Sequence, residues 1–208
     1  DTDPSTTFNG ISGNTYLLRW TTSNGVCSTQ DDVQIHFYPI PDVDAADKTI
    51  CSGSNASVVI DNPNLVPGTT FSWTVFSSSN VTGAAGGNGS LISQILTNTD
   101  PVNPGSVVYR ITPSANGCPG APLDVTVNVS PKPFITDPPT SFIQEICSGT
   151  PFIFSPTSPV PGTTFNWTTT IIGTLTGVNA SGTGPTITDN HVNATNSNGV
   201  IIYTITPT

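Results

Sequence analysis

The chain has 208 residues, of which 35% are hydrophobic and 8% charged, and its 13 acidic and four basic residues give a formal net charge of −9. This balance disfavours nucleic acid and anionic lipid as partners, because binding to either needs a basic patch. No apolar run reaches the roughly 18 residues that suggest a membrane span, so we expect no membrane insertion. The 19 glycines and 20 prolines indicate a chain divided by many turns.

Residues 1–40 contain one pair of alternating stretches, TYLLRWTTSNGVC at 15–27 and DDVQIHF at 31–37. Two alternating runs around an Asn-Gly turn are typical of a β-hairpin. The segment is too short for a whole domain, so we interpret it as the closing hairpin of a truncated immunoglobulin-like module. Trp20 is its expected core aromatic.

Residues 41–132 show the rhythm of a complete β-sandwich, with short strands roughly 8 to 12 residues apart and turns of Pro, Gly and Asn between them. The Gly-rich stretch at 83–89 is expected to be a flexible loop. Short extended linkers are expected at PIP and PKP, because proline fixes φ and cannot extend a strand ladder. The predicted strands lie near 44–49, 57–60, 69–75, 90–96, 106–112 and 123–129.

Residues 133–208 repeat the middle segment with offsets of 94 to 96 positions, which is the signature of tandem modules. We expect this third module to lack its final strand, and the native chain to continue in both directions. The repeated stretches are ICSG at 50–53 and 146–149, VPGTTFSW at 66–73 and VPGTTFNW at 160–167, and VVYRITP at 107–113 and IIYTITP at 201–207.

The repeated TTFxW stretch alternates so that its Phe and Trp share one face of a strand. In sandwiches such aromatics fill the space between the two sheets, and we favour this packing role. The alternative is an exposed platform that stacks on sugars. The residues concerned are Phe71, Trp73, Phe165 and Trp167.

The four cysteines form no zinc-binding pattern and favour an oxidising, extracellular setting. Cys51 lies at the first strand of the middle module and Cys118 in the turn before its last strand, so we predict a disulfide between them. Cys147 and Cys27 are their counterparts in the neighbouring modules and are expected to be unpaired here. Reduced core cysteines are the alternative.

An acidic cluster at the first linker, Asp42, Asp44 and Asp47, offers oxygen ligands for calcium at a module junction. A solvated acidic surface is the alternative, because the second linker has no such cluster. The two histidines, His36 and His191, lie in no nucleophile motif. We therefore expect no catalytic activity and no other cofactor.

The ICSG start, the TTFxW strand, the YxITP strand, the GC turn and the PxP linker together resemble the PKD-like repeat modules of SprB-type gliding adhesins, very large surface proteins of Bacteroidetes. The hairpin at 15–37 is similar to the tail of the immunoglobulin-like repeats of such proteins. This resemblance implies type IX secretion, display at the outer membrane, and contact with a surface.

The sequence therefore predicts an all-β chain of tandem immunoglobulin-like, PKD-like β-sandwich modules in an extended array. The predicted function is that of a structural or adhesive stalk of a secreted cell-surface protein. Its expected partners are neighbouring modules and an extracellular polysaccharide or abiotic surface. The alternative is a carbohydrate-binding or accessory module array of a secreted enzyme.

Overall fold

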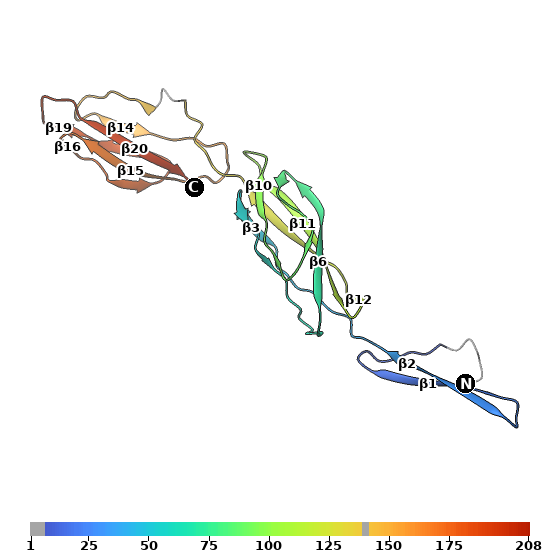
Figure 1. Cartoon of the computed structure of the whole chain (residues 1–208). Coiled ribbons are helices and arrows are strands. Elements are labelled where there is room, and N and C mark those ends of the chain that lie inside the picture. Colours follow the sequence, from blue (N-terminus) through green and yellow to red (C-terminus); the bar gives the residue numbers. More distant parts are fainter. Residues whose placement is uncertain (1–6, 139–141) are drawn as a thin grey trace.

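The computed structural model describes residues 7–138 and 142–208 (Figure 1). The regular structure of these residues is β-strand, and the strands form three groups along the chain with no pairing between groups. The described residues include no helix with the length and hydrophobicity that a membrane crossing needs. The prediction of an all-β, immunoglobulin-like sandwich fold is confirmed.

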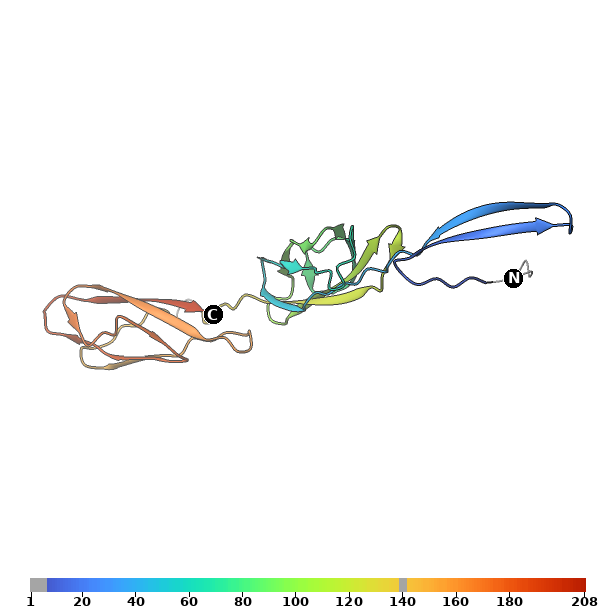
Figure 2. The same ribbon diagram turned by 90° about the horizontal axis from the view of Figure 1, so that it is seen from below.

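The first group is a hairpin of β1 (Thr15–Ser23) and β2 (Ser28–His36), paired antiparallel along their whole length. Its turn forms because the Asn24 side chain accepts hydrogen bonds from two following backbone N–H groups, and Gly25 takes a φ of 91°. Figure 2 shows this hairpin, in blue, standing clear of the middle module. No second sheet of the described residues lies against the hairpin and Trp20 is 54% exposed, so Trp20 is not a core aromatic of this structure, contrary to the prediction.

The second group, between 48 and 130, is a two-layer sandwich. One layer has the order β3 (Lys48–Cys51), β13 (Leu123–Ser130), β11 (Gly105–Ala115), β6 (Thr70–Ser79) and β8 (Gly87–Asn88), with β12 (Cys118–Pro119) paired to β11. The other layer pairs β10 (Ile95–Asn98) with β4 (Ser54–Asn55) and β7 (Val81–Thr82), and β5 (Val58–Val59) with β9 (Leu91–Ile92).

The core of this module lies between the layers and is built from alternate strand residues, as expected where one face of each sheet is covered. Burying one such branched or aromatic side chain stabilises the fold by about 1.5 to 3 kcal/mol. The fully buried members are Val58, Ile92, Leu96, Val107, Tyr109, Ile111, Val125, Val127 and Val129.

The third group repeats this architecture with fewer strands. One layer has the order β17 (Ser181–Thr183), β15 (Phe165–Ile172) and β20 (Val200–Pro207). The other layer contains β14 (Pro151–Phe154) with β18 (Ile187–Asn190), and β16 (Leu175–Thr176) with β19 (Val192–Asn193). The central register is preserved, since Trp73 lies opposite Ile111 in one module and Trp167 opposite Ile205 in the other.

The Gly-rich stretch of the middle module is only partly a loop, because Gly87 and Asn88 form strand β8 beside β6. A Cβ atom on Gly87 would stand 2.6 Å from Cζ2 of Trp73. Gly182 has the same relation to Trp167, and a Cβ there would also overlap the indole. The glycine therefore leaves the space that lets the indole lie against the neighbouring strand in each module.

Gly87→Ala is expected to lower the free energy of unfolding of the middle module by about 1 to 3 kcal/mol, because the added methyl group overpacks against the indole of Trp73. Urea denaturation of the variant and of the parent chain measures the difference.

The control is a double-mutant cycle with Trp73→Phe, whose smaller ring lacks the atoms that the new methyl group would meet. The Gly87→Ala cost should fall in the Trp73→Phe background. An equal cost in both backgrounds would show that the indole is not the cause.

Candidate functional site

The two cysteines predicted to bond lie at opposite ends of the middle module. All four cysteines of the chain are described, and all four are free. Cys51 pairs with Ser130 at the end of β13, whereas Cys118 pairs with Ala115, past the start of β13. At about 3.3 Å per strand residue, the separation exceeds about 20 Å. A disulfide needs Cα atoms within about 7 Å, so the predicted Cys51–Cys118 bond is wrong.

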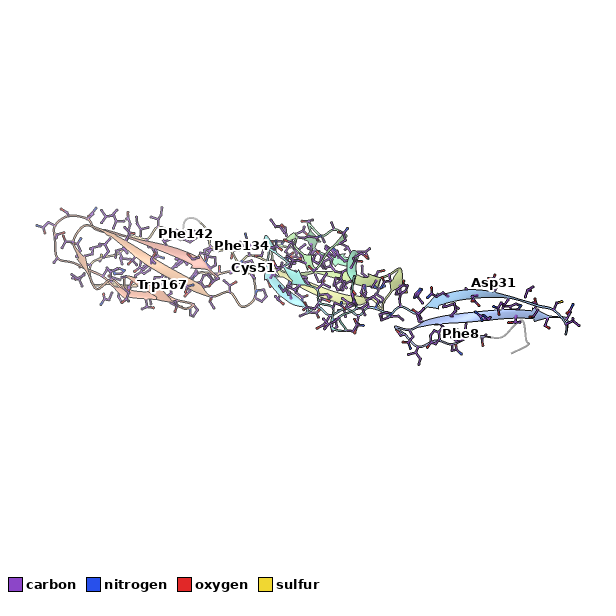
Figure 3. All side chains as sticks on the ribbon, turned by 60° about the horizontal axis from the view of Figure 1, so that its bottom comes forward. Phe8, Asp31, Cys51, Phe134, Phe142 and Trp167 are labelled. Atoms are coloured by element: carbon purple, nitrogen blue, oxygen red, sulfur yellow. The ribbon has the colours of Figure 1, made fainter. Side chains whose placement is uncertain are left out.

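The disulfide prediction failed because it did not take into account the direction of the first strand, β3. Because β3 runs parallel to β13, Cys51 at its end lies where the chain leaves the module. Figure 3 shows Cys51 at the end from which the chain continues to Phe134. Cys27 lies in the hairpin turn and Cys147 before β14, and both are exposed.

The three candidate calcium ligands do not converge. Asp47 Oδ1 accepts a hydrogen bond from the backbone N–H of Thr126 at 2.7 Å. Asp42 Oδ1 accepts one from the N–H of Val43 at 2.9 Å, and Asp44 forms a backbone bridge with Asp61. Among the described residues no group of three or more His, Cys, Asp or Glu could hold a metal ion. These aspartates therefore serve the backbone, and the calcium interpretation is not supported.

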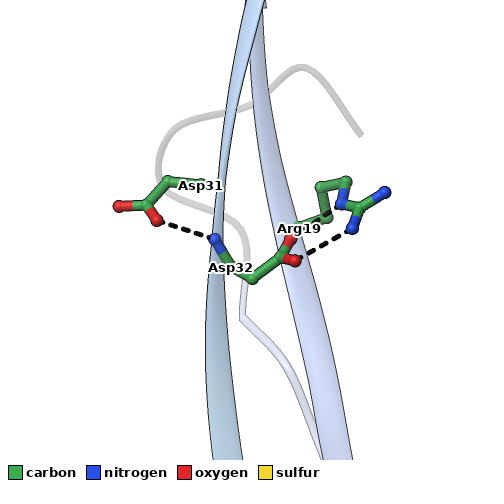
Figure 4. A network of polar contacts seen from close by, with 3 residues as sticks. All are labelled: Arg19, Asp31 and Asp32. Carbon is green, nitrogen blue, oxygen red and sulfur yellow. Dashed lines mark hydrogen bonds and ion pairs between the residues drawn. The ribbon is translucent and has the colours of Figure 1, made fainter.

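The hairpin carries a surface ion pair across its two strands (Figure 4). Arg19 donates from Nε to Oδ1 of Asp32 at 2.7 Å and from Nη2 to Oδ2 at 2.9 Å. The hydrogen bond from Arg19 lowers the pKa of Asp32 below its usual value. Asp31 points the other way and accepts from the N–H of Asp32. The pair fixes strand register on the outer face and leaves no free acidic cluster there.

The middle module repeats this pair with Arg110 and Asp124, which are cross-strand neighbours on β11 and β13. Here the guanidinium carbon also lies 3.6 Å from the ring centroid of Phe76. Phe76 is the extra residue of a β-bulge in β6, since Val75 faces Tyr109 and Ser77 faces Val108. The bulge turns an apolar ring onto the solvent face, where the arginine covers it.

The repeated aromatics face the core. Phe71, Trp73 and Phe165 are buried, and Trp167 is partly buried. Trp73 donates from Nε1 to the carbonyl oxygen of Ala85 at 3.2 Å. Buried rings of this kind cannot stack on a sugar, so packing is their role.

The third module contains a buried polar cluster that the sequence interpretation missed. The Tyr203 hydroxyl donates to Oδ2 of Asp189 at 2.5 Å and lies 3.0 Å from Nε2 of His191. Asp189 is 4% exposed and His191 7% exposed. Asn179 donates from its side-chain amide to Asp189 Oδ1. His191 lies between β18 and β19, and the centroid of its ring is 6.0 Å from that of Phe152.

The middle module fills the same places with neutral residues. The Tyr109 hydroxyl donates to Oε1 of Gln94 at 2.7 Å, so Gln94 accepts the hydrogen bond that Asp189 accepts in the third module. Leu96 stands where the third module has His191, since Gly53 N–H donates to the Leu96 carbonyl oxygen as Gly149 N–H does to that of His191. The sequence did contain a sign of this cluster. In the aligned repeats, Asp189 and His191 of TITDNH stand where Gln94 and Leu96 of SQIL stand, at alternate positions that face inward.

The cluster is incompletely satisfied. His191 Nδ1 is buried and has no hydrogen-bond partner, and the same holds for Nε1 of Trp167. Burial and the neighbouring Asp189 carboxylate raise the pKa of Tyr203 above its usual value, so its hydroxyl stays protonated as a donor. Such a network links β18 to β20 through side-chain hydrogen bonds.

Alkaline pH is expected to weaken the middle module through Tyr109. Burial raises the pKa of Tyr109 to about 12, so between about pH 10 and pH 12 the folded state keeps a proton that the unfolded state releases. The free energy of unfolding should therefore fall as pH rises through this window, by roughly 1 kcal/mol between about pH 8 and about pH 11. Urea denaturation at about pH 8 and about pH 11 measures the fall.

The fall should be smaller in Tyr109→Phe, which has no hydroxyl to titrate, and unchanged in Tyr38→Phe, whose ring is 49% exposed. An equal fall in Tyr109→Phe and in the parent would assign the alkaline effect to other groups.

Asp189→Ala should destabilise the third module, because it removes the carboxylate that accepts hydrogen bonds from the Tyr203 hydroxyl and the Asn179 amide. The expected cost is about 1.5 to 3 kcal/mol, the usual value of a hydrogen bond to a charged group. Thr188→Ala is the matched control, since Thr188 is the exposed neighbour on β18. Thermal unfolding of both variants gives the comparison, and equal melting temperatures would contradict a stabilising network.

One of three comparisons with known proteins identifies the family of this chain. A family model described as a PKD-like domain matches residues 48–133 and 144–208, which are the middle and third modules. Among solved structures, a crystal structure of DIP-gamma IG1+IG2 is similar at 10% identity and a TM-score of 0.30, over 79% of this chain and 95% of that chain. None of the curated proteins compared with the chain matches it. Since the family model spans more than half of the 208 residues, the chain belongs to the PKD-like domain family.

Proposed function

We propose that this chain is a load-bearing segment of a large secreted surface protein, in which PKD-like modules follow one another as an extended stalk. The family match supports a structural or adhesive module. The resemblance of the repeats to SprB-type gliding adhesins supports the more specific role of contact with a surface, with export by the type IX system and display at the outer membrane. Its partners are then the adjoining modules and an extracellular polysaccharide or abiotic surface.

The observation that carries the proposal is the parallel pairing of the first and last strands of the middle module. Four consecutive residues are paired, from Lys48 opposite Val127 to Cys51 opposite Ser130. The incoming chain passes Gly120 at Pro41, near β12, and the outgoing chain leaves after Ser130 at the other end (Figure 1). Tension on the chain therefore pulls β3 and β13 lengthwise in opposite directions.

Lengthwise sliding loads the hydrogen bonds between two strands together, because each lies across the direction of pull. Peeling apart a hairpin would instead load its hydrogen bonds one at a time. A module closed by parallel terminal strands therefore resists extension until several bonds fail in one step. Resistance of this kind is a property of the unfolding rate, which is what a stalk under load requires.

Asp47 extends this clamp by one bond. Its carboxylate accepts the N–H of Thr126, one residue before the ladder of β13 with β3 begins. A side chain thus continues the ladder where the β3 backbone does not. The aspartate that the sequence suggested as a calcium ligand has a mechanical role in this proposal.

Single-molecule extension of a chain that carries the middle module tests the proposal. The parent should unfold in one step at high force, and Asp47→Ala should unfold at a lower force. The loss of roughly 1 kcal/mol should raise the unfolding rate at zero load by up to about fivefold. Asp42→Ala is the matched control, because Asp42 Oδ1 accepts only from the next residue in the chain.

Unfolding of the parent at the low force of a peeled hairpin would contradict the load-bearing role, as would an equal force for parent and Asp47→Ala. A carbohydrate-binding array is the competing function, and its stacking rings would be among the exposed aromatics, which include Trp20, Tyr38, Phe76 and Phe142. Retention of the chain on a polysaccharide, lost in Trp20→Ala or Phe76→Ala, would favour that function instead.

A further inference from the structure

The chain enters the middle module through a short connection, residues 37–44, which lies between β2 and β3 (Figure 1). At its start, Phe37 still belongs to the hairpin, because both its N–H and its carbonyl oxygen form backbone hydrogen bonds there. At its end, Asp44 is held to Asp61 by two backbone hydrogen bonds of 3.1 and 2.9 Å. We call this connection the entry joint.

The side chain of Asn64 pairs with the backbone of the entry joint. Its Nδ2 donates to the carbonyl oxygen of Ile40 at 2.9 Å, and its Oδ1 accepts from the N–H of Asp42 at 3.1 Å. These two backbone groups flank Pro41, which has no N–H of its own. One side-chain amide, with its donor and its acceptor, therefore bonds to the joint as a residue of a neighbouring strand would.

Packing holds the joint at the same place. Pro41 is fully buried, and Val43 is 8% exposed and belongs to the core of the middle module. A Cβ atom on Gly120 would stand 2.0 Å from the Pro41 carbonyl oxygen and 2.8 Å from Cγ of Pro113, so only glycine allows this approach. The body of the middle module therefore begins at the joint, well before its first strand.

Only two residues, Tyr38 and Pro39, lie between the hairpin and the first residue that Asn64 holds. Proline fixes its own φ, and the residue before a proline is confined to extended conformations. Ile40 is confined in the same way by Pro41. The joint therefore has little backbone freedom as long as Asn64 holds its two partners.

We propose that Asn64 fixes the entry joint, so that the segment preceding the middle module keeps one direction relative to it. Loss of the Asn64 amide extends the free stretch from residues 38–39 to residues 38–43, up to the bridge of Asp44 with Asp61. The inference concerns how the chain is directed and not the force that a module withstands. The joint lies outside the β3–β13 ladder, so a failure of the load-bearing role would leave this inference intact.

The distance between two spin labels, measured by pulsed electron paramagnetic resonance on the complete chain, tests the proposal. One label is on the exposed Cys27 in the hairpin turn and the other on Ser72→Cys, at an exposed position of β6, with the other three cysteines replaced by serine. The parent should give one narrow distance peak. Asn64→Ala should widen it by up to about 1.7-fold, because the span of a free stretch grows as the square root of its length.

Amide hydrogen exchange shows whether the variant acts at the joint. The Asp42 N–H should exchange about fivefold faster in Asn64→Ala, because it loses its acceptor. Exchange along β11 should equal that of the parent, since the core of the module is unchanged. Asn64→Asp keeps the size of the side chain but replaces the donor to Ile40 by an acceptor, so it should also widen the distance peak.

Asp42→Ala is the matched control, because it alters a side chain of the joint but keeps the N–H that Asn64 accepts. It should keep the peak width of the parent. Equal widths in the parent and in both Asn64 variants would overturn the proposal. Equal widening in Asp42→Ala, or a parent whose peak is already as broad as that of Asn64→Ala, would also overturn it.

Discussion

The parallel pairing of β3 with β13 is the contact on which the complete module depends. It places the first and last strands side by side, closes the main sheet, and sets the incoming and outgoing chain at opposite ends. The same contact explains why Cys51 lies far from Cys118 and why Asp47 can accept the N–H of Thr126. In the third module, whose described residues include no counterpart of β13, the segment 144–147 forms no strand and the apolar face of β20 is less covered.

The two modules have the same strand register and the same indole–glycine contact, but different side chains surround the central tyrosine. In each, an indole lies against a glycine of the neighbouring strand, and the central strands keep one register. Around the buried tyrosine, however, the middle module uses the neutral Gln94 and the third module uses Asp189 and His191. A buried network that leaves His191 Nδ1 without a partner is less tolerant of change than an apolar core. The modules therefore share a fold and differ in the polar side chains around the central tyrosine.

Much of the fold could be predicted because local alternation specifies it. The stretches 69–75, 106–112 and 123–129 became β6, β11 and β13, and the Asn-Gly turn at 24–25 joined β1 to β2. Strand β8 was missed because glycine carries no side chain that could show alternation. Glycine is required at Gly87 because the indole of Trp73, on the neighbouring strand β6, occupies the space that a side chain would fill.

The errors at the candidate site have one origin, since each depends on how distant strands are arranged. To judge whether Cys51 could bond to Cys118, the direction of β3 relative to β13 must be known, and the sequence around the two cysteines does not indicate it. Burial of Trp20 requires a second sheet, and the hairpin has none. The Asp189–Tyr203–His191 cluster joins residues of different strands, so it could be found only by aligning the two repeats position by position.

Amide hydrogen exchange of the unmodified chain, without any added ligand, tests the role of the β3–β13 contact most directly. The account predicts strong protection at Ile50 and Ser52, whose N–H groups face β13, and along 125–130. It predicts rapid exchange at Ile146, although KTIC and QEIC precede the two Cys-Ser-Gly repeats in the same way. Equal protection at Ile50 and Ile146 would contradict it, because strand formation before the Cys-Ser-Gly would then not depend on a β13-type partner.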